Sequence, residues 1–132
     1  MRKVTRLMIR EFKLKEVGFD FMGYHLNAGD KYTFHHLVIA RRFGGPYARW
    51  NGAILCGNTS HPYLHTIEEY DHDMFYYLTS EMVDINFKGY LDVENLRKIN
   101  NLLCQFEREH CSDRVHNGKY LIKEEYTRRI KI

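Results

Sequence analysis

Cysteine is scarce in this sequence and its spacing is uninformative. Three of the 132 residues are cysteine, and no two of them form a CxxC pair. An odd number of thiols without framework spacing argues against a disulfide scaffold. It is typical of a reducing compartment, so we expect a cytoplasmic protein.

Long apolar stretches are missing as well. No run approaches the roughly 20 apolar residues of a membrane helix, and the basic N-terminal segment lacks the apolar centre of a signal peptide. The sequence also contains no internal repeat, low-complexity tract or domain linker. We therefore predict one domain over residues 1–132 that does not associate with a membrane.

The composition is that of a globular domain, but the charge is distributed unevenly. Hydrophobic residues make up 44% of the chain and charged residues 28%, which are ordinary values for a folded domain. Residues 1–50 carry ten basic and four acidic side chains, whereas residues 51–90 carry one and six. Basic side chains contact backbone phosphates independently of base sequence. We predict that Arg41, Arg42 and Arg49 bind nucleic acid in this way.

Four of the eight histidines lie between Tyr32 and Asp71, in two pairs. His35 and His36 end a segment with strand character, where neighbouring side chains point to opposite faces. They can have different roles only if the strand ends there and the backbone bends, and then one imidazole can bind a metal while the other stays free to accept a proton. His61 and His65 are four residues apart on a predicted helix, so they share a face and can bind the same ion. The pattern is typical of a hydrolytic metal site.

The remaining pattern predicts an α+β protein. Gly44, Gly45 and Pro46 interrupt regular structure between two short strands. Asp92 offers a helix cap, and Gly89 a helix stop. We expect strands over 17–24, 32–37 and 53–56, helices over 60–70, 73–85 and 93–110, a polar loop over 112–118, and either a strand or a helix over 4–12 and over the tail 119–132.

The stretch from Tyr32 to Asp71 resembles the HNH motif of the His-Me finger, or ββα-metal, nucleases. HHL stands at the first-strand position of that motif, WNGAILC resembles the segment that carries its middle asparagine, and SHPYLH resembles the start of its metal-binding helix. The His-His start and the HxxxH end are most similar to the colicin-type DNases. The resemblance covers about 40 of the 132 residues. It implies a ββα-metal core at about 32–71, with a helical extension at about 73–111.

The resemblance implies a role for each matched residue. His36 corresponds to the general base that activates water, and His35 to the metal ligand that precedes it. Asn51 corresponds to the asparagine that holds the connecting loop and so positions the base. His61 and His65 correspond to the metal-binding positions of the helix, and which of the two lies closer to the ion stays open. The spacing from Cys56 to His61 is one residue longer than in members that read CxxCH.

Cys56 has two interpretations. Many relatives stabilise the fold with zinc bound by paired CxxC motifs, which this chain lacks. We interpret Cys56 as a small buried hydrophobe. The competing hypothesis assigns Cys56, His61, His65 and one further histidine to a structural zinc site without catalysis.

The resemblance implies a metal-dependent endonuclease that hydrolyses DNA phosphodiester bonds, of a kind that occurs in bacteriophages and other mobile elements. One divalent ion is expected, and Mg, Mn, Ni and Zn all stay open. We expect double-stranded DNA as the partner, with weak sequence specificity, although RNA stays open. The main alternative is a protein on the same fold that binds nucleic acid, or inhibits a host protein, without cleavage. A protein partner or self-association also stays open.

Overall fold

A two-stranded antiparallel hairpin lies at the centre of the fold. In the computed structural model, which describes residues 1–130, β1 (Tyr32–His36) pairs with β2 (Gly52–Cys56). The register places Tyr32 opposite Cys56 and His36 opposite Gly52. Residue 52 has no room for a side chain, because an ideal Cβ there would lie 2.2 Å from Cε2 of Phe34. The close packing of this ring on the glycine backbone fixes how the two strands meet.

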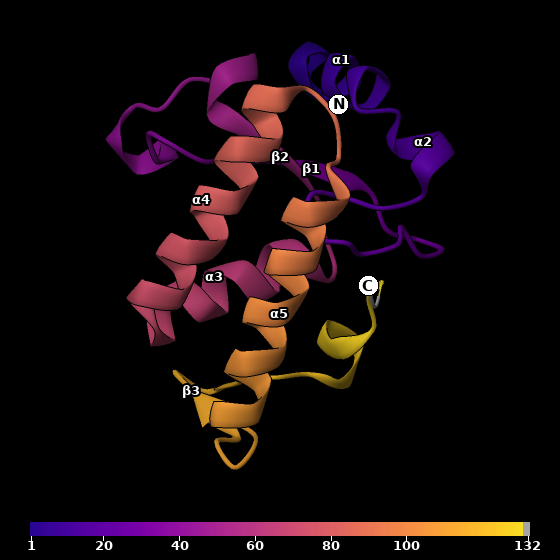
Figure 1. The fold of residues 1–132 in the computed structure, drawn as a ribbon. Helices are drawn as coiled ribbons and strands as arrows, with labels where there is room; N and C mark the ends of the chain where they lie inside the picture. The colour runs from indigo at the N-terminus through magenta and orange to yellow at the C-terminus, as the bar shows by residue number, and fades with distance from the viewer. Residues whose placement is uncertain (131–132) are drawn as a thin grey trace.

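Helices cover the hairpin on both sides. The N-terminal helix α1 (Lys3–Glu11) contacts both strands and is followed by the short α2 (Leu14–Val17). Helix α3 (Ser60–Tyr70) follows β2 directly, and α4 (His72–Lys88) packs against α3, α5 and β2. Figure 1 shows α4 and α5 (Val93–Glu109) side by side, with α1 and α2 at the opposite end of the molecule from β3. This arrangement is a small α+β fold, as predicted.

The predicted long helices are confirmed, and their ends follow from capping side chains. Asp71 Oδ1 accepts a hydrogen bond from the Met74 amide at 3.0 Å, and Asp92 Oδ1 accepts one from the Glu94 amide at 3.2 Å. Gly89 ends α4 in the left-handed conformation, with φ of 84°. Helix α3 has the predicted bounds, while α4 extends slightly beyond residues 73–85 at both ends. The undecided segment 4–12 is helical, which buries Met8, Ile9 and Phe12 against the hairpin.

The predicted strand over 17–24 is wrong. Residues 18–31 form an irregular loop that winds around the buried carboxylate of Asp20. Its Oδ1 accepts hydrogen bonds from the amides of Met22 and Tyr24, at 2.8 and 3.0 Å. Its Oδ2 accepts from the amide of Cys56 at 2.9 Å. Burial raises the pKa of Asp20, and these hydrogen bonds oppose that shift. The alternating aromatic residues therefore belong to a loop in which two backbone donors bind the Asp20 side chain, while the amide of Phe21 donates to the Ile54 carbonyl of β2 at 3.2 Å.

The C-terminal segment is less regular than expected. A small hairpin of β3 (Val115–His116) and β4 (Lys119–Tyr120) lies within the predicted loop and the start of the tail. The tail then forms a short 3-10 helix, Glu124–Thr127, instead of one strand or one α-helix, and its residues 131–132 lie outside the described residues. Across the described chain, no helix combines the length and apolar composition that crossing a bilayer requires.

Candidate metal centre

Three histidines from two elements converge on one point. His35 lies at the end of β1, and His61 and His65 lie one turn apart on α3. One nitrogen of each ring lies within 4.8 Å of the corresponding nitrogens of the other two. Nε2 of His35 is buried and makes no hydrogen bond within the described chain, which is costly for a polar atom without a ligand. Imidazole nitrogens are common ligands of divalent ions, so this set fits one such ion.

Neighbouring side chains fix which ring nitrogen of His61 and of His65 faces this point. The Thr33 hydroxyl donates to the Leu55 carbonyl at 2.8 Å and lies 2.6 Å from Nδ1 of His61. Because its hydrogen is already used, the hydroxyl oxygen must accept from Nδ1–H of His61. Glu68 Oε1 lies 3.0 Å from Nδ1 of His65 and accepts in the same way. Both rings therefore keep Nε2 as the nitrogen with a lone pair, the state that a metal requires.

Burial favours the neutral form of His35 and His61 in the metal-free protein. The pKa of His35 is lowered well below its usual value, first by burial and then by the nearby His61 and His65. Burial, followed by the proximity of His65, lowers the pKa of His61 to about 4. Neutral imidazole is the form that binds metals. The environment therefore prepares these side chains for an ion at neutral pH.

His36 lies on the other face of β1. Its ring packs edge-on against Phe34 and Tyr47, with centroids 5.0 and 4.6 Å away. Burial lowers the pKa of His36, as do the charges of Arg41 and Arg2, whereas a backbone hydrogen bond with Gly45 opposes the shift. The ring is only half-buried and is neutral at pH 7. His36 is therefore separate from the three converging histidines, although its Nε2, like that of His35, is buried and makes no hydrogen bond within the described chain.

The buried side-chain amide of Asn51 connects separate parts of the β1–β2 loop through hydrogen bonds. Its Oδ1 accepts from the amides of Val38 and Ile39, at 2.9 and 2.8 Å. Its Nδ2 donates to the carbonyls of Ile39 and Pro46, at 2.9 and 3.1 Å. All four hydrogen-bonding positions of the amide are thus filled by the loop that follows His36. Gly45 allows the loop to close, because an ideal Cβ there would lie 1.9 Å from the Ile39 carbonyl oxygen.

The histidines open onto a cleft that is lined partly by arginine. The cleft has a volume of about 540 Å³ and is bordered by His35, His36, His61 and His65, with Arg41 and Arg42 among its other lining residues. A hollow of about 940 Å³ adjoins it and shares Arg42, His65 and Glu68 with it. The cleft therefore brings two of the three predicted phosphate-binding arginines to the histidine cluster.

Arg49 has other contacts. Its guanidinium forms an ion pair with Glu11 of α1 and donates to the backbone oxygen of Asn86 of α4 at 2.9 Å. The Asn86 side chain donates back to the Arg49 carbonyl at 3.0 Å. The charge is thereby compensated within the protein, and Arg49 lies outside the lining of the cleft. These contacts join the loop to α1 and α4, and phosphate binding by Arg49 stays a prediction.

Cys56 is a buried, free thiol in β2. Its Sγ lies 3.7 Å from the carbonyl oxygen of Tyr24, and burial raises its pKa. A raised pKa disfavours the thiolate form that zinc binds. Among the described residues, the group that can hold a metal consists of three histidines without Cys56. These contacts favour the small buried hydrophobe over the structural zinc site.

Some residues that contact the site histidines were not predicted, although patterns in the sequence indicate them. Thr33 lies two residues before His35 on the same face of β1, and Glu68 lies three residues after His65 on α3. Strand and helix periodicity would have found both. Arg2 lies 3.5 Å from the centre of the Tyr47 ring, beside His36. That contact is between residues far apart in sequence, and no local pattern indicates it.

Comparison of the chain with protein-family models, with curated proteins and with solved structures finds no match in any of the three. The geometry of the site is therefore the basis on which a function can be inferred.

Proposed function

We propose that this protein is a metal-dependent endonuclease of the HNH type that hydrolyses DNA phosphodiester bonds. The observation that carries the proposal is the convergence of His35, His61 and His65 around one point, with His36 outside that group but in the same cleft. One group can thus hold an ion while a separate neutral imidazole takes a proton. Phosphodiester hydrolysis at neutral pH requires both functions.

The arrangement of the chain supports the finer assignment to a ββα-metal core. Strand β1, the Asn51-tied loop, strand β2 and helix α3 follow one another in the order of that core. The Asn51 hydrogen bonds hold the backbone of the loop that follows His36. Asn51 thus acts as a positioning residue, because it fixes where the His36 ring points without facing the substrate itself.

The residues of the cleft then have distinct tasks. His36 accepts a proton from water as the water oxygen attacks phosphorus, and the bond from phosphorus to the 3′ oxygen breaks. Arg41 and Arg42 attract the phosphate backbone into the cleft. His35, His61 and His65 would hold a divalent ion, which when bound would supply Lewis-acid stabilisation of the phosphate and of the departing oxygen. The all-imidazole donor set is suited to borderline ions such as Zn and Ni, although Mg and Mn belong in the test.

Cleavage of supercoiled plasmid tests this proposal. Wild-type protein with Mg, Mn, Ni or Zn is expected to produce nicked and linear DNA, and excess chelator is expected to stop the reaction. His65→Ala, purified identically, removes one ligand from an exposed position and is expected to be inactive, which excludes a contaminating nuclease. The matched control His25→Ala changes an exposed histidine whose ring packs at a tilt against Phe19, and it is expected to cleave like wild type.

Two outcomes of the plasmid experiment would contradict the nuclease. Absence of cleavage with every metal, while DNA is still retarded in a gel, would instead support a nucleic-acid-binding protein. Absence of both cleavage and retardation would support a protein partner, the remaining alternative. Cleavage that continued in excess chelator would refute the metal-dependent mechanism.

A further inference from the structure

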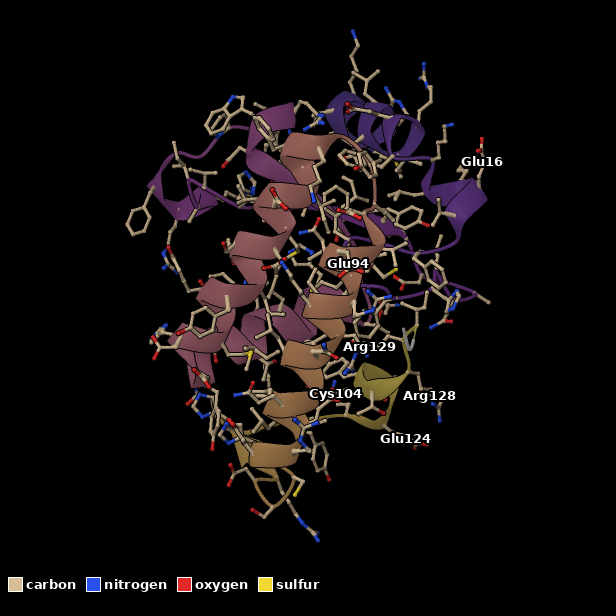
Figure 2. All side chains as sticks on the ribbon, viewed as in Figure 1. Glu16, Glu94, Cys104, Glu124, Arg128 and Arg129 are labelled. Atoms are coloured by element: carbon tan, nitrogen blue, oxygen red, sulfur yellow. The ribbon has the colours of Figure 1, made fainter. Side chains whose placement is uncertain are left out.

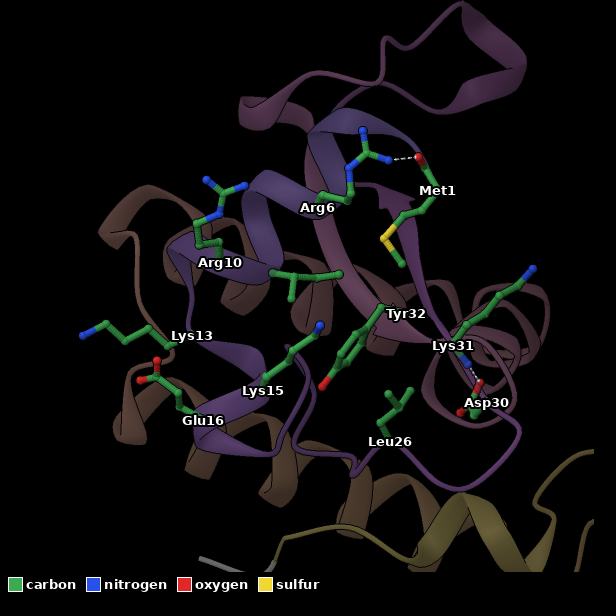
Figure 3. Close-up of a pocket in the computed structure, with 11 residues that line it drawn as sticks. Met1, Arg6, Arg10, Lys13, Lys15, Glu16, Leu26, Asp30, Lys31 and Tyr32 are labelled. Atoms are coloured by element: carbon green, nitrogen blue, oxygen red, sulfur yellow. Dashed lines mark hydrogen bonds between the residues drawn. The ribbon is translucent and has the colours of Figure 1, made fainter.

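A second pocket lies on the side of the hairpin where α1 and α2 pack. It has a volume of about 580 Å³ and shares no lining residue with the histidine cleft in the described part of the chain. Ile9, Leu26 and Tyr32 give it an apolar floor. Figure 3 shows Lys15 extending toward Tyr32, with Arg6 and Arg10 on one side and Lys31 on the other. Its size is that of a typical small-ligand site, about 300–1,000 Å³.

The rim of this pocket is strongly basic. Its five cations are Arg6, Arg10, Lys13, Lys15 and Lys31. None of the five forms an ion pair within the described residues, while Arg6 donates only to the Met1 carbonyl at 2.6 Å. The lining contains two carboxylates, Glu16 and Asp30, so the positive charge is in excess. Such a field attracts an anion.

Helix α1 connects this pocket to the histidine cleft. Arg2, Arg6 and Arg10 are spaced four residues apart, so they lie along one face at intervals of about 6 Å. Arg2 packs on Tyr47, which contacts His36, and Arg6 and Arg10 border the pocket. A basic stripe therefore runs from the candidate general base to the pocket. The phosphates of a nucleic-acid strand can bind along this stripe.

We propose that this pocket binds one unpaired nucleotide of a nucleic-acid strand whose neighbouring phosphates lie along the α1 stripe. The phosphates contact the basic rim, and the base enters the apolar floor beside Tyr32. A base within a duplex is paired and stacked, so only an unpaired base can enter. This inference rests on the proposed function and narrows it to substrates with a single-stranded region near the scissile phosphate.

Binding of metal-free protein to a fluorescent single-stranded oligonucleotide tests the pocket, with His36→Ala as the background. The variant Arg6→Gln/Lys15→Gln removes two rim charges. It is expected to bind at least about 10-fold more weakly, and its dependence of log affinity on log salt is expected to be shallower by about 1.4. The control Arg97→Gln/Arg128→Gln removes the same charge from residues paired with Glu94 and Glu124. Its salt dependence is expected to match that of the background protein.

Entry of the nucleobase into the pocket is tested by changing the oligonucleotide. An oligonucleotide of the same length without bases is expected to bind about 5- to 100-fold more weakly than the normal strand, and a blunt duplex more weakly than the single strand. Equal binding of strands with and without bases, tighter binding of the blunt duplex, or equal losses in the two double variants would overturn the proposal. So would equally tight binding to phosphatidylserine vesicles with the same dependence on Arg6 and Lys15.

These measurements separate the pocket from the nuclease. Selective single-strand binding without metal-dependent cleavage of either the plasmid or the single-stranded oligonucleotide by wild-type protein would refute the nuclease and support the pocket. Metal-dependent cleavage with no effect of Arg6→Gln/Lys15→Gln on strand binding would refute the pocket and leave the nuclease standing.

Discussion

Replacing His36 by alanine is expected to slow DNA cleavage by about 10²- to 10⁴-fold, the usual contribution of a general base. The imidazole is the neutral group in the cleft that lies outside the converging triad, so its loss removes the acceptor for the proton of water. Metal binding is expected to persist, because His35 points to α3 and His36 to the opposite face of β1. Single-turnover cleavage rates and calorimetric metal titrations measure the two properties separately.

The pairing of those two measurements makes the His36→Ala experiment specific. A variant that lost cleavage and metal together would indicate a misfolded site, so its thermal unfolding is compared with that of wild type. The ring packs against Phe34 and Tyr47 but is only half-buried, so the variant should fold. Retained cleavage at the wild-type rate would show that another group takes the proton and that His36 is not the general base.

Replacing Arg129 by alanine is expected to lower the free energy of unfolding by about 3–5 kcal/mol. The Arg129 side chain is 2% exposed and binds both carboxylate oxygens of Glu107 on α5, at 2.8 and 2.9 Å. It also donates to Asn100 at 3.0 Å and to the Tyr126 carbonyl at 3.2 Å. The substitution leaves the largely buried Glu107 charge without its partner, and it detaches the C-terminal segment from α5. Denaturant unfolding monitored by circular dichroism gives the value.

The neighbouring residue provides the matched control. Arg128 carries the same charge, but its side chain is 70% exposed and it pairs with the exposed Glu124. Figure 2 shows the two arginines next to each other, Arg129 near Cys104 of α5 and Arg128 away from the helix. Arg128→Ala is expected to change the free energy of unfolding by no more than about 0.5 kcal/mol. Equal effects of the two substitutions would show that the Arg129–Glu107 pair does not hold the tail.

Local sequence signals predicted the helical part of the fold well. Asp71, Gly89 and Asp92 act through their own backbone neighbourhoods, so their effect can be read from a short stretch of sequence. The loop after α2 could not be predicted in the same way. Its conformation depends on Asp20 binding Cys56 and Ser60, residues 36 and 40 positions away. Such pairings are set by tertiary structure, and the aromatic alternation of the loop resembled a strand.

The same distinction applies to the candidate site. Helical spacing predicted that His61 and His65 share a face, and strand alternation predicted that His35 and His36 separate. The ion pair of Arg49 was not predicted, because its position in a basic loop contains no information about Glu11, which comes from α1. The basic pocket was also not predicted, since α1, α2 and β1 form it only after they pack together.

A calorimetric titration of metal-free protein with Zn or Ni tests the central claim most directly, because the proposed chemistry depends on one ion held by three histidines. We predict one ion per chain in wild type and in the control His25→Ala, and an affinity at least about 100-fold lower in His65→Ala. Absence of binding by wild type, or binding by His65→Ala with wild-type affinity, would contradict the metal centre and the hydrolytic function proposed from it.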